Sequence, residues 1–375
     1  MKISVIAGLT SVLLVLCHSA YAQSASLEQT LALASEKMFA ASGASGMVTA
    51  VVRGDTLLIQ SYGETEQGNG QRPNANSLLR VGSMSKVLAS ELMVKLAKEG
   101  RLKLTDPLQK YAPHGAQVPQ ISRYTPITLL SLATHTSGLP RSASGKAPEH
   151  AAPFTWPDHA ARWHWLHRQM PILVPGTHAR YSNVAYDLLA DAISTAGGKP
   201  YAQLLREKIT IPLGMHDTTL TPTAEQCGRL MVGAGIDPAG PCTDTRATGG
   251  SGGVYSTAND MGLWMQHLLG ISQAAPAAQR AVCQAIYVQR QELASIEGLD
   301  LAGRASGLGL GWVLLAATDH SPAILQKTGG GGGFMSYMAL VPGHKLGVFV
   351  AISKVDMEMF SRMTQAVNAL LVSLD

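Results

Sequence analysis

The sequence contains few aromatic, charged or cysteine residues. Of its 375 residues, 5% are aromatic and 14% are charged, and four are cysteines. The 29 Lys and Arg residues exceed the 25 Asp and Glu residues by a net charge of +4, with no run of five like charges. A basic stripe of the kind that binds nucleic acid is therefore absent, and we expect no nucleic-acid partner. No Cys-x-x-Cys pair occurs, which excludes the common cysteine zinc sites.

Hydrophobic residues and glycine are abundant. Hydrophobic residues make up 46% of the chain, enough for a buried core, and the length allows two structural lobes. The 38 glycines are densest in two tracts, 249–253 and 329–333, and show no collagen-like period. We expect the first tract either to line a cleft or to form a flexible turn.

The N-terminus has the parts of a secretory signal. A basic residue precedes an apolar run over 3–16, and Ala20 and Ala22 occupy the two small-residue positions of a cleavage site. The run is shorter than the ~20 apolar residues of a membrane-spanning helix. We therefore predict a cleaved signal peptide over 1–22 and an exported protein. A membrane anchor and a lipid on Cys17 are the alternatives, and peripheral association with the inner membrane after export stays open.

Three cysteines remain after cleavage of the signal. An exported chain can hold a disulfide, and a bond between Cys227 and Cys242 would close a short loop and stabilise it by ~3 kcal/mol. Cys283 is then unpaired. His164 and His167 have a helical spacing, but without a cysteine cluster we interpret them as surface or packing residues and expect no metal.

Periodic apolar patterns predict strands near both ends of the chain and helices between them. The predicted strands cover 47–52, 57–62, 310–315, 323–327, 334–341 and 346–353. The predicted helices cover 87–99, 185–196, 201–208 and 356–374, with another after 253. This pattern favours an α/β fold in which one antiparallel sheet is built from both ends of the chain. We expect an α/β lobe of 23–103 and 243–375, a mostly helical lobe of 104–242, and an active cleft between them.

The first candidate catalytic motif is Ser83-Met84-Ser85-Lys86, where a strand-like segment turns into a helix. Residues three apart on a helix project from one face, so the Ser83 hydroxyl and the Lys86 amine can meet. A serine hydroxyl needs an adjacent base to become a nucleophile, and a partly buried lysine can have its pKa lowered enough to serve. On its own the motif is better explained by a helix-capping serine followed by a solvated lysine, because chance produces many Ser-x-x-Lys sequences.

Two further motifs change that balance. Tyr181-Ser182-Asn183 precedes a helix and offers a phenol that can exchange protons and an amide that can orient a ligand. Lys327-Thr328-Gly329 ends a strand-like run and offers a cation and a hydroxyl. A helix cap and a strand end are the structural alternatives. Three such motifs in this order favour a catalytic interpretation.

These motifs resemble the Ser-x-x-Lys, Tyr-x-Asn and Lys-Thr-Gly motifs of the serine penicillin-binding proteins and class C β-lactamases. The resemblance extends over essentially the whole chain after the signal and is most specific around 326–337. It implies a β-lactamase/transpeptidase-like fold with helices flanking an antiparallel sheet. It also implies that Ser83 is the nucleophile and that Lys86 and Tyr181 share its proton. Which of these two is the base stays open.

The resemblance also implies a set of substrate-binding residues. Asn183 would bind the amide of a peptide or β-lactam, and Lys327 with Thr328 would hold the terminal carboxylate. The backbone N–H of Gly330 would join that of the nucleophile in an oxyanion hole, although many class C enzymes have serine at this position. The segment 135–139 also resembles a family segment, and its glycine-terminated helix end favours a structural role.

The function implied by the resemblance is acyl transfer through a serine ester, with no metal and no organic cofactor. The expected enzyme is a periplasmic D-alanyl-D-alanine carboxypeptidase and endopeptidase that acts on peptidoglycan peptides and binds β-lactams. A class C β-lactamase is the nearest alternative, because it shares these residues and differs in the rate at which its acyl-enzyme hydrolyses. The sequence also leaves open an esterase and a non-catalytic cell-wall binding protein.

Overall fold

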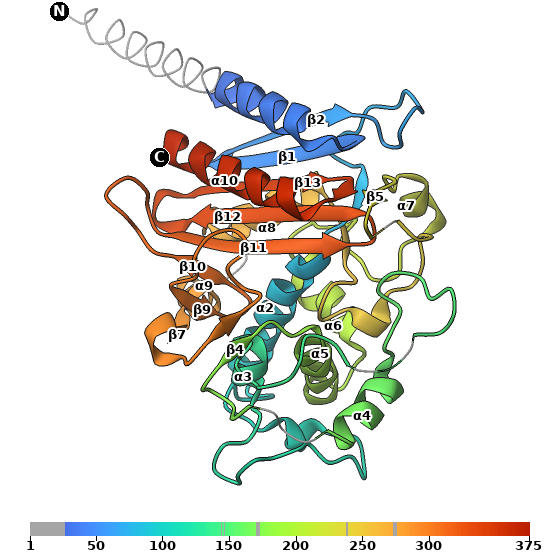
Figure 1. The fold of residues 1–375 in the computed structure, drawn as a ribbon, viewed down its shortest axis with the longest axis vertical. Helices are drawn as coiled ribbons and strands as arrows, with labels where there is room; N and C mark the ends of the chain where they lie inside the picture. Colours follow the sequence, from blue (N-terminus) through green and yellow to red (C-terminus); the bar gives the residue numbers. More distant parts are fainter. Residues whose placement is uncertain (1–26, 144, 146, 170–172, 238, 273–275) are drawn as a thin grey trace, which may run out of the picture.

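An eight-stranded antiparallel sheet is the centre of the fold (Figure 1). The computed structural model describes residues 27–375 except 144, 146, 170–172, 238 and 273–275. The strand order is β2-β1-β13-β12-β11-β10-β9-β7. The predicted signal peptide and Cys17 lie outside the described residues.

The sheet joins the two ends of the chain, as predicted. Its strands are β1 (Gly46–Arg53), β2 (Thr56–Gly63), β7 (Ile286–Gln289), β9 (Gly307–Gly309), β10 (Val313–Leu315), β11 (Ile324–Gly331), β12 (Phe334–Val341) and β13 (Leu346–Ile352). Strand β1 pairs with β2 on one side and with β13 on the other, where Met47 lies opposite Ile352. The prediction of an antiparallel sheet built from both termini is therefore confirmed.

Two of the predicted strands differ from the structure. The prediction of one strand over 310–315 is wrong, because the chain turns between β9 and β10 and Gly311 adopts a φ of +81° there. Strand β11 continues past the predicted end at 327. Gly329 and Gly330 remain paired with Ser336 and Met335 of β12, so the glycine tract begins as sheet.

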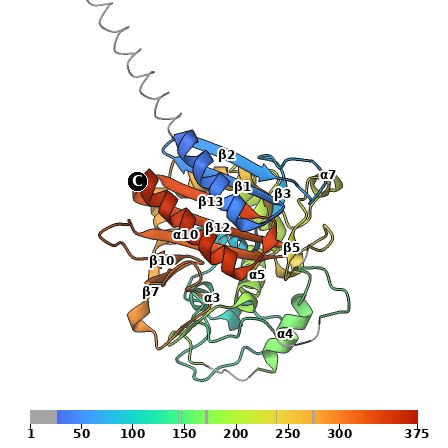
Figure 2. The ribbon, with the colours of Figure 1, turned by 45° about the horizontal axis from the view of Figure 1, so that its top comes forward.

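Both faces of the sheet are covered by helices. Residues 27–42 form a helix that lies with α10 (Met357–Leu374) over one face, as Figures 1 and 2 show. On the other face lie α8 (Ala258–Leu268) and α2 (Ser85–Lys98). Strand β1 supplies both cores, because alternate residues point to opposite faces: Met47 and Val51 pack under α10, whereas Val48 and Val52 pack toward α8.

Helices are the main regular structure between the β1–β3 region and the C-terminal strands. They are α3 (Leu129–Ala133), α4 (His159–His167), α5 (Asn183–Gly197), α6 (Tyr201–Leu205) and α7 (Ala224–Gly228). The helix predicted over 201–208 ends earlier, because a π-helical turn, η3 (Arg206–Thr210), follows α6. Helix α2 is buried along almost its whole length and packs against α5. Nowhere in the described part of the chain is a helix both long enough and apolar enough to cross a bilayer.

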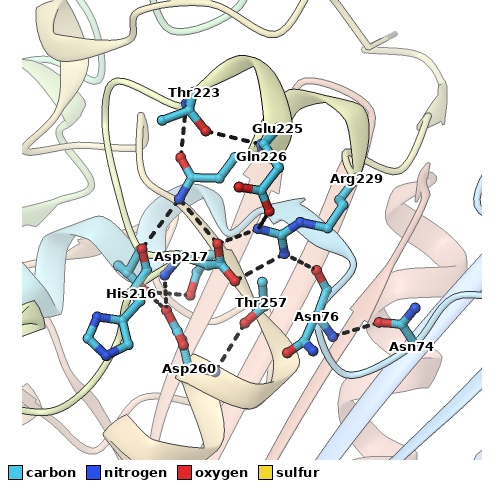
Figure 3. Close-up of polar contacts among 12 residues, drawn as sticks. Asn74, Asn76, His216, Asp217, Thr223, Glu225, Gln226, Arg229, Thr257 and Asp260 are labelled. Carbon is cyan, nitrogen blue, oxygen red and sulfur yellow. Dashed lines mark hydrogen bonds and ion pairs between the residues drawn. The ribbon is translucent and has the colours of Figure 1, made fainter.

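A polar cluster fixes the chain beside the strand that leads to the predicted nucleophile (Figure 3). The guanidinium of Arg229 donates to both carboxylate oxygens of Asp217, at 3.0 and 2.5 Å, and to the carbonyl of Asn76 at 2.6 Å. The backbone of Arg229 in turn accepts from the N–H of Leu78 at 2.8 Å. The cluster thereby holds β3 (Leu78–Arg80) in register with the segment after α7.

A disulfide closes the loop that begins in α7. Cys227 is bonded to Cys242, and their Cα atoms lie 5.6 Å apart, which confirms the predicted pair. Cys283 is a buried free thiol, also as predicted. Burial raises its pKa far above the usual range, so it stays protonated and unreactive.

Candidate active site

A sharp turn presents Ser83 at the start of α2. Strand β3 pairs with β6 (Tyr255–Thr257) and leads into η1 (Gly82–Met84), a 3₁₀ turn that continues into the helix. Gly82 adopts a φ of +54°, and a Cβ placed on it would lie 2.6 Å from the nitrogen of Gly330. Only glycine fits this position without strain. The close approach brings the turn that carries Ser83 against β11.

Strand β11 lies against the same turn at a second point. A Cβ on Gly329 would lie 2.4 Å from the carbonyl oxygen of Val81 and 2.3 Å from Oγ of Ser336. The Ser336 hydroxyl donates to that carbonyl at 3.0 Å and ties β12 to the turn. Gly330, the next residue, is exposed. Its backbone therefore borders the turn that carries Ser83, at the start of a helix.

Three predicted residues converge on one oxygen. The Ser83 Oγ lies 3.0 Å from Nζ of Lys86, which donates to it, and 2.5 Å from the phenol oxygen of Tyr181. All three side chains are buried, and Lys86 is fully so. Both a lysine amine and a tyrosine phenol thus lie within proton-transfer distance of one serine hydroxyl.

Two more oxygens hold the Lys86 amine. Its Nζ donates to the side-chain oxygen of Asn183 at 2.8 Å and to the backbone carbonyl of Ser251 at 2.5 Å. Ser251 lies in the 249–253 glycine tract, so this tract lines the site. Of the two roles expected for the tract, a cleft lining and a flexible turn, the first is the one observed. Three acceptors at these distances fix the direction of the amine toward Ser83.

A buried carboxylate supports this arrangement. Asp187 lies one turn after Asn183 on α5, and its two oxygens each accept a hydrogen bond from Ser251 at 3.0 Å, one from the backbone N–H and one from the hydroxyl. Burial raises the pKa of Asp187, while its charge raises the pKa of Lys86. Asp187 therefore both orients the Ser251 carbonyl and opposes the loss of charge from the amine.

Burial makes the two lysines of the site weak cations. Desolvation lowers the pKa of Lys86 to about 7, with the charge of Arg141 lowering it further and that of Asp187 opposing. Desolvation likewise lowers the pKa of Lys327 to about 8. A substantial share of Lys86 is therefore a neutral amine near neutral pH, the form that accepts a proton.

The Lys-Thr-Gly motif enters the site from β11. Lys327 is buried, and its Nζ lies 5.1 Å from the centroid of the Tyr181 ring. Thr328 follows on the same strand and is half-buried, and Gly330 lies beyond it against the nucleophile turn. The structure thus brings segments centred on 83, 181 and 327 into one site.

His135 supports the Tyr181 ring. It belongs to the segment 135–139, for which a structural role is predicted. Its ring stacks on that of Tyr181 with centroids 4.6 Å apart, and its Nδ1 accepts from the Ser182 N–H at 3.1 Å. Burial and the charges of Lys327 and Lys86 lower the pKa of His135 far below the usual range, so the ring is neutral. It buttresses the phenol without adding charge.

The comparisons with known proteins identify the family. The family profile described as β-lactamase matches residues 32–371. The D-alanyl-D-alanine-carboxypeptidase/endopeptidase AmpH of Escherichia coli K12 is 47% identical over 339 residues, which are 90% of this chain and 87% of that protein. The chain belongs to the β-lactamase family. The predicted family membership is thereby confirmed.

Solved structures of β-lactamase family members have the same fold. A β-lactamase/D-alanine carboxypeptidase from Yersinia pestis, solved in complex with citrate, is 50% identical and superposes with a TM-score of 0.88 over 93% of this chain and 98% of that one. A class C β-lactamase from Rhodobacter sphaeroides is 25% identical, with a TM-score of 0.71 over 90% of this chain and 98% of that one. The predicted β-lactamase/transpeptidase-like fold is confirmed.

Proposed function

We propose that this protein is a serine D-alanyl-D-alanine carboxypeptidase and endopeptidase that acts on peptidoglycan peptides through an acyl-enzyme on Ser83. The observation that supports it most is the placement of the Ser83 hydroxyl between the Lys86 amine and the Tyr181 phenol. The name of the Escherichia coli relative, together with 47% identity over most of both chains, supports the choice of substrate.

Acylation begins with attack of Ser83 Oγ on the carbonyl carbon between two D-alanine residues. The hydroxyl proton passes to the Lys86–Tyr181 pair as the C–O bond forms, and the same pair returns a proton to the departing amine. The negative charge on the former carbonyl oxygen is bound by the backbone N–H groups of Ser83 and Gly330. The products of this half-reaction are a serine ester and free D-alanine, or a longer amine when the bond is a peptide cross-link.

The remaining motif residues hold the substrate. Lys327 and Thr328 bind the terminal carboxylate, because a cation and a hydroxyl at the end of one strand suit a carboxylate. Asn183 binds the amide on the acyl side while its oxygen keeps Lys86 in place. Water then attacks the ester, and the Lys86–Tyr181 pair activates it in the same way.

The location of the protein follows from the proposed substrate. We propose export to the periplasm with removal of residues 1–22, and we retain the division into an α/β lobe of 23–103 and 243–375 and a mostly helical lobe of 104–242. Ser83 and Lys327 then come from the first lobe and Tyr181 from the second. The disulfide fits an oxidising compartment.

The direct test is digestion of purified muropeptides, followed by mass spectrometry of the products. Wild-type protein is expected to release D-alanine from pentapeptides and to cleave D-alanyl cross-links, whereas Ser83→Ala is expected to do neither. Ser361→Ala, a serine of α10 on the other side of the sheet, is the matched control and keeps both activities. Intact muropeptides after incubation with wild type contradict the proposal.

A second measurement distinguishes a peptidase from a class C β-lactamase. The likeness to the class C β-lactamase of Rhodobacter sphaeroides makes the latter the alternative to test. Stopped-flow mixing with benzylpenicillin gives both the acylation rate and the lifetime of the adduct. A peptidase forms a long-lived adduct, whereas a β-lactamase releases hydrolysed penicillin over many rapid turnovers. Rapid turnover together with inert muropeptides favours the β-lactamase.

A further inference from the structure

Three basic side chains surround the ring of Tyr181. The Nζ atoms of Lys86 and Lys327 lie 4.8 and 5.1 Å from the ring centroid, and Cζ of Arg141 lies 4.8 Å from it. The two lysines are buried, whereas Arg141 is exposed at the rim of the site. The carboxylate of Asp187 is the negative charge that raises the pKa of Lys86. Positive charge thus exceeds negative charge around the proposed nucleophile, which favours a substrate with more than one anionic group.

The backbone of Arg141 is fixed beside the residue proposed to hold the acyl side of the substrate. The N–H of Asn183 donates to the Arg141 carbonyl at 2.7 Å, and the Ser182 hydroxyl donates to the Pro140 carbonyl at 2.7 Å. These bonds tie the loop after α3 to the start of α5. Arg141 therefore lies next to Asn183 and presents its side chain at the same end of the site.

The Arg141 guanidinium is available to a ligand. None of the ion pairs among the described residues includes it, and its Cζ lies 4.8 Å from the centroid of the Tyr181 ring. The N–H groups of a guanidinium lie in its own plane, around its edge. Two parallel N–H groups match the two oxygens of a carboxylate, a pairing that lysine cannot reproduce.

We propose that Arg141 forms an anion subsite that binds a side-chain carboxylate on the acyl part of the substrate, on the residue that precedes the D-alanyl-D-alanine unit. The inference rests on the proposed function and narrows its substrate class. Lys327 takes the terminal carboxylate of the leaving residue, and Arg141 takes a second carboxylate on the other side of the bond that breaks. Peptides with an acidic residue before D-alanine are the preferred substrates.

Two penicillins provide a matched pair of probes. Carbenicillin carries one carboxylate on its side-chain carbon that benzylpenicillin lacks, and both acylate through the same ring carbonyl. We measure the second-order rate constant of acylation for each and take the ratio of carbenicillin to benzylpenicillin. Arg141→Gln is expected to lower this ratio about tenfold, as for the loss of a charge-assisted hydrogen bond at a partly exposed site. The ratio for Arg141→Lys, which keeps the charge, is expected to lie between the ratios for wild type and Arg141→Gln.

Arg72→Gln is the control for the loss of one positive charge. Arg72 is exposed and also lies over a tyrosine ring, 5.9 Å from the centroid of Tyr62, which belongs to the edge strand β2. Its ratio is expected to match that of wild type. The same double comparison with two N-acyl-D-alanyl-D-alanine peptides, one with a side-chain carboxylate and one with a carboxamide, extends the test to peptide substrates.

The outcomes distinguish the two proposals. If Arg141→Gln slows acylation by both penicillins equally, Arg141 acts through the general charge of the site and the subsite does not exist. If Arg141→Gln leaves both rates unchanged, the subsite does not exist either. If wild-type protein reacts with neither penicillin and cleaves no peptide, the proposed function fails and the subsite fails with it.

Discussion

Replacement of Gly82 by alanine tests how the proposed oxyanion hole is built. Gly82 has a φ of +54°, a conformation that costs an L-residue about 1–2 kcal/mol. The new Cβ would also lie 2.6 Å from the nitrogen and 2.9 Å from the oxygen of Gly330, well inside the ~3.5–4.0 Å of an ordinary contact. Forced contacts of this kind cost about 1–3 kcal/mol more. We expect Gly82→Ala to lower the free energy of unfolding by about 2–5 kcal/mol.

Gly54→Ala separates the two contributions. Gly54 has nearly the same φ, +55°, but a Cβ there meets nothing within 4 Å. Its substitution therefore carries the backbone strain alone, about 1–2 kcal/mol. The difference between the two variants in urea unfolding measures the contact between the nucleophile turn and β11.

The same contact decides the effect on activity. Relief of the clash moves Gly330 away from Ser83, and loss of one oxyanion donor lowers a rate by about 10²–10³-fold. We expect a decrease of this size in the acylation rate of folded Gly82→Ala with benzylpenicillin, whereas Gly54→Ala keeps the wild-type rate. A folded Gly82→Ala protein that acylates at the wild-type rate refutes this account of the oxyanion hole.

Three further predictions concern charge and crosslinking. Asp187→Asn removes the charge that raises the pKa of Lys86, so the acid limb of the acylation rate, near pH 7 in wild type, is expected to move to lower pH. An unmoved limb contradicts the role of Asp187. His135 is buried and neutral, so below about pH 6.5 its ring binds a proton in the unfolded state but not in the folded state. Wild type is therefore expected to lose more free energy of unfolding than His135→Gln between pH 7 and 5. Equal losses contradict this prediction. Replacement of Cys227 and Cys242 by serine is expected to lower the free energy of unfolding by about 3 kcal/mol without slowing acylation by benzylpenicillin, and slower acylation contradicts a purely stabilising role.

The sequence predicts Ser83 and Lys86 from local geometry, and Tyr181, Asn183 and Lys327 only through the resemblance of their motifs to those of a family. Ser83 and Lys86 meet because residues three apart share a helix face, and the observed 3.0 Å contact needs no other element to place the two side chains together. Strands β12 and β13 are predictable nearly to their ends because they are buried on both faces and read as continuous apolar runs.

Ser251, Asp187 and Arg141 belong to none of the three motifs, and they could not be predicted because only tertiary packing brings them to the site. The Ser251 carbonyl is 165 residues from Lys86, and nothing in the glycine tract indicates which carbonyl would point toward an amine. Asp187 has the pattern of an ordinary helical position, and only the buried contact with Ser251 reveals its role. Likewise, Arg141 follows a proline in an irregular loop, where no periodicity indicates a direction.

The most direct test of the central claim is the mass of the protein after reaction with benzylpenicillin, followed by location of the adduct by peptide mapping. We predict one penicilloyl group per chain, attached to Ser83, and an unmodified Ser83→Ala protein under the same conditions. An adduct on another residue, or no adduct on a correctly folded wild-type protein, contradicts the claim that Lys86 and Tyr181 activate this serine for acyl transfer.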